Sequence, residues 1–243
     1  MPKTLKWGQA YTVLLDVGQI ANQFILDTST LDGTDVLDGS GDFVDATAYV
    51  LSVAIQRGRT TQTDQFSPGT CRVLADDRAS GRLFDPANTA SAWYQGSFDL
   101  APRRGIKVLA GTAELFVGAI TDLDITYEQP NLSFASIQSA DALYELGRTS
   151  LTAFNPSSQL TSARVSAILD RPEVNFSTAL RDISTGVATC GTVAYADNAN
   201  TLSALQSVAI AEDGRLFANR KNQIEFNPRI SFTFSTAIAS FGG

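Results

Sequence analysis

The sequence predicts a mainly β protein: a small barrel or sandwich of short strands, followed by a smaller α+β part. Alternating apolar and polar residues, broken by Gly, Pro and Asp turns, fill most of the first 146 residues. Helical spacing is found only at residues 140–147 and after residue 160. A chain of 243 residues can bury one large core or two smaller ones.

Strands of the first part are expected where β-branched and apolar residues alternate between turn signals. A short helix, residues 140–147, closes this part and is expected to stop at Gly147. The predicted strands are Tyr11 to Leu15, Gln23 to Leu26, Tyr49 to Gln56, Gly69 to Asp76, Ile106 to Leu109, Glu114 to Ile125 and Leu132 to Ala140.

The second part is expected to hold two helices and a hairpin. One helix begins with Thr161 or Ser162 as its N-cap and stops before Pro172, and the other closes at Gly214. A hairpin follows, with its turn at residues 219–222. The domain prediction is a β-barrel domain at 1–148 with an acidic segment at 1–44, a linker at 149–160, an α+β domain at 161–228, and the start of a further β element at 229–243.

Charge is unevenly distributed along the chain, whose net charge is −7. No Lys or Arg lies between Lys6 and Arg57, whereas that stretch holds seven aspartates: Asp16, Asp27, Asp32, Asp35, Asp38, Asp42 and Asp45. A groove that grips DNA needs Lys and Arg, so this block argues against one. It suits a surface that nucleic acid passes without sticking.

No catalytic residue, metal site or cofactor is expected. The chain has no histidine, which removes the commonest general base and the Ser-His-Asp triad. Phosphate-binding loops of Walker or Rossmann spacing are absent, and residues 31–42 lack the spacing of a calcium loop, which favours an acidic hairpin or flexible loop. Cys71 and Cys190 are expected to be reduced and buried. We expect neither a signal peptide nor a membrane anchor.

The stretch from Leu74 to Tyr94 combines acids, arginines and aromatic residues. Asp76 and Asp77 are neighbours on a strand end and point to opposite faces, so turn formation is favoured over a catalytic pair. Asp85-Pro86 is expected to start a turn. Trp93 and Tyr94 are expected to be core or interface anchors rather than a stacking platform.

Several segments follow one another in a characteristic order. The strand VLSVAIQRGRT is followed by TDQFSPGT, the arm DDRASGRLFDPANTASAWY, the segment GSFDLAPRRGIKVL and FVGAITDLDITY, and then by AILDRPEVNF, RDISTG and LSALQSVAIAEDGRLFANRKNQIEF. This order of motifs resembles the minor tail proteins of long-tailed bacteriophages. It departs at Asp77, where the family usually has Asn, and at Ala92-Trp93-Tyr94, where Ser-Pro-Tyr is usual. Residues 1–44 match loosely, and the family usually runs longer.

The resemblance implies a structural virion protein, not an enzyme: a tail-tip hub with a tail-tube-like β-barrel that closes the tail tube and leaves a lumen for DNA. It implies a homotrimer assembled in the host cytoplasm and contacts with the distal tail protein or tail tube, the tape measure protein and other minor tail or fibre proteins. The residues expected at structural or subunit contacts are Arg57, Arg59, Arg82, Phe84, Asp85, Pro86, Trp93, Tyr94, Arg103 and Arg104.

Three alternatives stay open: a hexameric distal tail adaptor, an acid glycoside hydrolase, and the tail hub of a gene-transfer particle.

Overall fold

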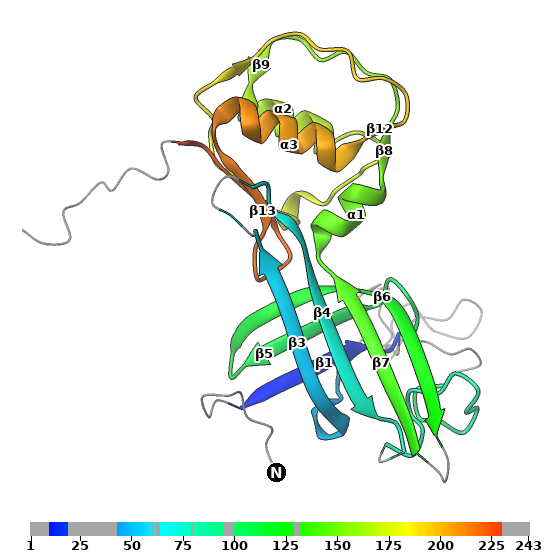
Figure 1. Cartoon of the computed structure of the whole chain (residues 1–243). Helices are drawn as coiled ribbons and strands as arrows, with labels where there is room; N and C mark the ends of the chain where they lie inside the picture. The colour runs from blue at the N-terminus through cyan, green and yellow to red at the C-terminus, as the bar shows by residue number, and fades with distance from the viewer. Residues whose placement is uncertain are drawn as a thin grey trace, which may run out of the picture. The chain divides into compact units, whose positions relative to one another are not determined.

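The structure is a computed structural model that describes residues 10–18, 43–59, 61, 64–78, 80–94, 100–128 and 132–229 (Figure 1). The chain forms two compact units. The first, called here the β unit, comprises Met1–Gln56 and Gly69–Asp141; the second, the α+β unit, comprises Arg57–Pro68 and Ala142–Gly243. The chain therefore crosses between the units three times.

The β unit is built on one seven-stranded sheet with the order β2-β1-β5-β6-β7-β4-β3. Neighbouring strands pair antiparallel wherever a register is defined. The strands are β1 (Tyr11–Asp16), β2 (Phe43–Asp45), β3 (Val50–Gly58), β4 (Ser67–Asp76), β5 (Gly105–Ala110), β6 (Ala113–Glu128) and β7 (Leu132–Ala140). The strand predictions at residues 11–15, 49–56, 69–76, 106–109, 114–125 and 132–140 are thus confirmed. The strand predicted at 23–26 lies outside the described residues.

The long strand β6 turns the sheet back on itself. Its first part pairs with β5 as far as Ala119, and its second part pairs with β7 from Ala119 to Glu128. A register shift lies between Ile120 and Asp122, as expected where a bulge bends a strand. Next to it, a Cβ on Gly118 would lie 2.4 Å from the Ala140 carbonyl oxygen, so the close approach requires glycine. In Figure 1, β3, β4, β7 and the end of β6 lie side by side, and β1 and β5 cross them.

The core of the β unit is formed by the inward faces of these strands. On β4, Cys71, Val73 and Ala75 are buried and alternate with more exposed residues, as the sequence predicted. Burying a Val or Ile side chain contributes about 1.5–3 kcal/mol. The buried core includes Val13, Leu15, Val50, Val73, Ile106, Val108, Phe116, Ile120 and Ile137.

The mainly β prediction is confirmed, but no strand pairing closes a barrel within the described part of the sheet. Its two end strands, β2 and β3, are consecutive in the chain and are joined by the 3-10 turn η1 (Thr47–Tyr49). The Ala46 amide donates to the Val13 carbonyl oxygen (2.9 Å), and the Val13 amide donates to Thr47 Oγ1 (2.8 Å). The chain itself therefore spans the gap where a closed barrel would have a strand pair.

The α+β unit packs three helices with short strands. The helices are α1 (Ala142–Arg148), α2 (Thr161–Leu169) and α3 (Thr201–Glu212), with a 3-10 turn η2 (Thr178–Leu180). β13 (Arg215–Ala218) and β14 (Ile224–Asn227) form the predicted hairpin, and β10 (Arg181–Ile183) adds parallel to β14. The fully buried residues of its core include Ile168, Leu205 and Phe226.

Two short strand pairs complete this unit. β8 (Ser150–Leu151) pairs with β12 (Ala199–Asn200), and β9 (Gln159–Leu160) pairs with β11 (Thr189–Cys190). Among the described helices, none is long and apolar enough to cross a membrane.

The helix ends differ from the predicted ones in detail. Gly147 lies inside α1, one residue before its end, and Leu160 rather than Thr161 or Ser162 occupies the N-cap of α2, without a side-chain cap bond. At the C-terminus of α3 the left-handed residue is Asp213 (φ 54°). Gly214 is needed for a different reason, because a Cβ there would lie 2.6 Å from the Asn227 carbonyl oxygen.

The predicted domain limits also differ from the compact units. Residues 57–68 and α1, both assigned by the prediction to the first domain, belong to the α+β unit. The predicted linker at 149–160 is part of that unit too, since it contains β8 and β9 and the buried Leu151. Polar composition suggested a linker, but the stretch is held by long-range pairing, which composition does not reveal. Most of the acidic segment 1–44 and of the element predicted at 229–243 lies outside the described residues.

Candidate functional site: the arm after β4 and its anchors

The arm, residues 78–94, leaves β4 at a buried carboxylate. Asp77 is fully buried; its Oδ2 accepts a hydrogen bond from Ser133 Oγ (2.8 Å), and its Oδ1 accepts one from the Phe84 amide (3.0 Å). The backbone of Asp77 is also paired, because its amide donates to the Ser133 carbonyl (3.0 Å) and its carbonyl accepts from the Arg82 amide (2.7 Å). One residue thus fixes the start of the arm to β7.

Within the arm, short side chains cap successive turns. The Ala87 amide donates to Asp85 Oδ1 (2.8 Å), which confirms the predicted turn at Asp85-Pro86. Asn88 Nδ2 donates to the carbonyl of Arg82 (2.9 Å), a residue with positive φ (61°). Ser91 Oγ accepts from the Trp93 amide (3.1 Å). Local hydrogen bonds of this kind hold an irregular backbone in one conformation without pairing to a neighbouring strand.

Aromatic rings then hold the arm against the core of the β unit. Phe84 is fully buried and Trp93 is 4% exposed; their ring centroids are 5.0 Å apart and perpendicular. Tyr49 adds an edge contact to Phe84 at 6.4 Å. Phe84 and Trp93 are therefore core residues of this chain, whereas Tyr94 is half-buried and Pro86 exposed. A role for any of the four at a contact between subunits stays a prediction.

The predicted arginines do not gather at the arm. Arg57 Nη2 donates to the Ala218 carbonyl (2.8 Å), and Arg59 lies 5.0 Å from the Phe66 ring, so both belong to the α+β unit. Arg104 is 4.0 Å from Asp16, a weak and partly exposed ion pair. Among the described residues, neither Arg82 nor Arg103 forms an ion pair.

The residues that position the arm most directly, Asp77 and Ser133, were not among the predicted site residues. A usable signal was present: an acid directly after an alternating strand is a common turn former. Tyr127 was missed as well. Its side chain is 57% exposed, yet partial desolvation and a hydrogen bond with Asp85 raise its pKa, so the end of β6 lies beside the arm.

In the described part of the arm, the acidic side chains are not arranged as a catalytic pair. Asp76 and Asp77 do not act as a pair, since Asp76 lies near Arg78 (4.0 Å) whereas Asp77 is buried and fully hydrogen-bonded. No group of three His, Cys, Asp or Glu that could hold a metal occurs among the described residues. Cys71 and Cys190 are both free, but Cys190 is only half-buried, which corrects the expectation that both are buried. Burial raises the pKa of the Cys71 thiol to about 12.

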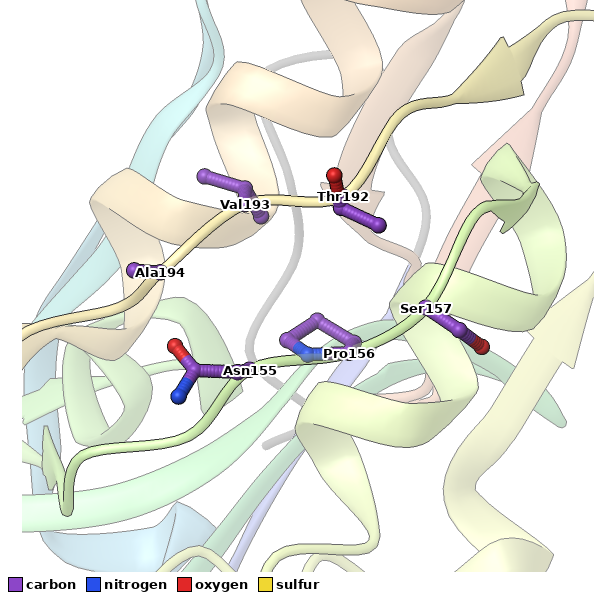
Figure 2. A pocket seen from close by; sticks show the side chains of 6 residues that line it. All are labelled: Asn155, Pro156, Ser157, Thr192, Val193 and Ala194. Carbon is purple, nitrogen blue, oxygen red and sulfur yellow. The ribbon is translucent and has the colours of Figure 1, made fainter.

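An opening lies in the α+β unit between two antiparallel segments (Figure 2). It has a volume of about 460 Å³ and is lined by Asn155, Pro156, Ser157, Thr192, Val193 and Ala194. On one side the Phe154 and Tyr195 rings stack at 5.2 Å; on the other, buried Arg164 donates from Nη2 to the carbonyls of Ser157 and Gly191 (both 2.9 Å). None of the six lining residues is titratable, so they supply no acid or base for a reaction.

The buried carboxylate of Glu212 holds the loop before β11 in place. Glu212 Oε2 accepts hydrogen bonds from Thr161 Oγ1 (2.5 Å) and the Ala188 amide (2.9 Å), and its carboxylate also accepts from the Val187 amide. Burial raises the pKa of Glu212, but these hydrogen bonds lower it by more, so it lies below its ordinary value. The arrangement is structural: it joins α2, α3 and the loop.

The fold is shared with two tail proteins of known structure. The 43 kDa tail protein of prophage MuSo2 from Shewanella oneidensis matches with a TM-score of 0.57 and 9% identity, over 90% of this chain and 54% of that chain. The tail protein from Neisseria meningitidis MC58 matches with a TM-score of 0.54 and 9% identity, over 89% of this chain and 50% of that one. This chain therefore spans about half the length of each. No family model and no curated protein matches the sequence. The predicted resemblance to phage tail proteins is confirmed at the level of the fold.

Proposed function

We propose that this chain is a structural subunit of a phage tail. The observation that carries the proposal is the fold itself, which matches two tail proteins over about nine tenths of this chain. The site chemistry is consistent with it. The buried carboxylates Asp77 and Glu212 are both engaged by hydrogen bonds that hold loops in place, as in a scaffold.

Within the tail, the proposed position is the tip, where three copies form a hub that closes the tail tube and leaves a lumen for DNA. The proposed partners are the distal tail protein or tail tube, the tape measure protein and other minor tail or fibre proteins. The motif order from residue 45 to residue 230 supports this finer assignment, because it resembles the minor tail proteins of long-tailed phages.

The mass of the purified oligomer tests this assignment. Light scattering coupled to size exclusion should give three times the mass of the chain. A mass of six chains favours the distal tail adaptor, and a single chain at every concentration contradicts a self-assembling ring. Turnover of peptidoglycan or polysaccharide that is lost on mutating Asp76, Asp77 or Asp85 would favour the hydrolase instead.

A further inference from the structure

The opening shown in Figure 2 interrupts a two-stranded ribbon of the α+β unit. At one end of it, Phe154 and Tyr195 exchange backbone hydrogen bonds (3.2 and 3.0 Å), and at the other end Gln159 pairs with Cys190. Between these two pairs, in a part of the chain that the structure describes throughout, no backbone hydrogen bond joins residues 155–158 to residues 191–194. The ribbon is therefore held at both ends of the opening and is unpaired along it.

The side chain of Arg164 reaches this ribbon from α2 without an acidic partner. It is 1% exposed, and its Nη2 donates to the carbonyl oxygens of Ser157 and Gly191, one on each side of the ribbon (both 2.9 Å). Among the described residues it forms no ion pair, and its Nε is buried without a hydrogen-bond partner. Burying a cation is costly unless an anion lies beside it. The two carbonyl groups satisfy one nitrogen but do not neutralise the charge.

The residues around the opening supply no counter-ion for this guanidinium. Residues 153–160 and 187–196 contain no charged residue, and Arg164 is the only charged residue of α2. A second donor at the same end of the opening also lacks an acceptor, because Gln159 Nε2 is buried and unpartnered. Since buried donors are nearly always satisfied, these two indicate an acceptor that another molecule brings.

The rest of the opening fits an extended peptide. Its volume of about 460 Å³ is in the range of ligand pockets, which is about 300–1,000 Å³. Its lining combines polar Asn155, Ser157 and Thr192 with apolar Pro156, Val193 and Ala194. Strands whose backbone groups pair with no neighbour can take up the main chain of a peptide, and the pockets between them select its side chains. A carboxylate on such a peptide is the acceptor that the guanidinium lacks, and charge-assisted hydrogen bonds of this kind are strong.

We propose that this opening binds an extended peptide segment of another protein through one Asp or Glu side chain of that segment, whose carboxylate accepts hydrogen bonds from Arg164 and Gln159. The site goes beyond the proposed tail role, which assigns no ligand to the α+β unit. In the competing interpretation, Arg164 only ties the ribbon to α2 and no peptide enters.

Fluorescence anisotropy with the purified full chain tests the site. The probe is a pool of end-blocked heptapeptides that carry a neutral dye, with Asp at the centre and Ala, Val, Ser or Thr elsewhere; a matched pool has Asn at the centre. The Asp pool should bind, and the Asn pool should bind at least about tenfold more weakly, as expected when a hydrogen bond loses its charge. Equal binding of the two pools, or no binding of either, would overturn the proposal. Displacement of the Asp pool by an equal concentration of acetate would overturn it too, because the site would then take a free anion rather than a peptide.

Variants that fill the opening show where the peptides bind. Thr192 and Ala194 are exposed, so Thr192→Trp and Ala194→Trp should melt like wild type, yet they should reduce binding of the Asp pool to the level of the Asn pool. Ile210→Trp is the matched control, since Ile210 is 62% exposed on α3 and does not line the opening; it should bind as wild type does.

Nuclear magnetic resonance gives a direct readout of the guanidinium. The Nε–H signal of Arg164, assigned by its loss in Arg164→Lys, should shift when the Asp pool is added and much less with the Asn pool. Binding that survives both tryptophan variants, or an Arg164 signal that does not move, would refute this site and leave the tail role standing.

Discussion

At the scale of single residues, the arm depends on the hydrogen bonds of Asp77. Asp77→Ala should destabilise the β unit by about 3 kcal/mol, because it leaves the Ser133 hydroxyl and the Phe84 amide without their acceptor. Asp77→Asn should cost less, since the amide oxygen still accepts from Phe84 and the hydroxyl can turn to accept from the amide nitrogen. Urea unfolding of both variants checks the order. Equal losses would mean that the charge, not the hydrogen bonding, is what matters.

The Trp93 ring is the second anchor of the arm. Trp93→Ala should lower the free energy of unfolding by about 3–5 kcal/mol, as is typical when a packed aromatic side chain is removed. Tyr94→Ala is a suitable comparison because the neighbouring Tyr94 side chain is only half-buried. This substitution should lower the free energy of unfolding by less. Thermal melting and oligomer mass should be measured together. If Trp93→Ala matches wild type in both, the arm is not anchored by this ring.

The carboxylate of Glu212 makes stability depend on pH. Its pKa is lowered in the folded protein, so its contribution is present above the unfolded value of about 4.5 and is lost as the pH falls below it. Glu212→Gln should therefore be less stable than wild type at pH 7, and the difference should shrink towards pH 3. Urea midpoints across this range provide the measurement. A difference that is constant with pH would show that ionisation of Glu212 does not contribute.

At the scale of elements, the loop before β11 can approach α2 and α3 only through a glycine. A Cβ on Gly186 would lie 1.9 Å from Thr161 Oγ1 and 3.1 Å from Glu212 Oε2. Gly186→Ala should therefore push the loop away and lower the melting temperature by several degrees, about what 1–2 kcal/mol produces in a protein of this size.

Gly191 in the same region is the control for that substitution. A Cβ there would meet nothing within 4 Å, so Gly191→Ala should melt close to wild type. If both variants melt alike, the close approach at Gly186 is not a constraint on the fold.

At the scale of the whole molecule, the net negative charge of the chain leads to a prediction about the proposed ring. Asp16 and Asp45 bond nearby backbone amides, and the other five of the seven N-terminal aspartates lie outside the described residues. The exposed Asp122 and Asp124 add acidic groups on β6. We expect the lumen to present more Asp and Glu than Lys and Arg, because an acidic wall repels phosphate over about 8 Å at physiological salt.

Two measurements check the sign of the charge that lines the lumen. In a solved ring, charged side chains near the axis should be mainly acidic. In solution, a labelled duplex should show no binding at about 0.15 M salt, since binding without phosphate contacts lacks its main driving force. A lumen lined by Arg57, Arg59, Arg103 and Arg104, with salt-sensitive DNA binding, would reverse the prediction.

The sequence by itself determined the strands of the β unit other than β2, the helices and hairpin of the α+β unit and the turn at Asp85. Each depends on a local pattern in the sequence. Alternation with period two indicates a strand, apolar residues at helical spacing indicate a helix, and an Asp side chain that accepts from the amide two residues later indicates a turn. The order of motifs also indicated a tail protein, and the shared fold agrees with it. The sequence also predicted that Trp93 is a core or interface residue, because a large aromatic side chain is rarely left in water.

Only the tertiary structure decided how the sheet folds back at Gly118, that residues 57–68 pack with the second unit, and that the linker predicted at 149–160 belongs to that unit. It also decided that Arg57 donates a hydrogen bond to the Ala218 carbonyl oxygen in the α+β unit. These features depend on contacts between residues far apart in the chain. Local patterns set which face of an element is apolar, but which distant surface covers it is decided by packing and by the need to pair every buried polar group.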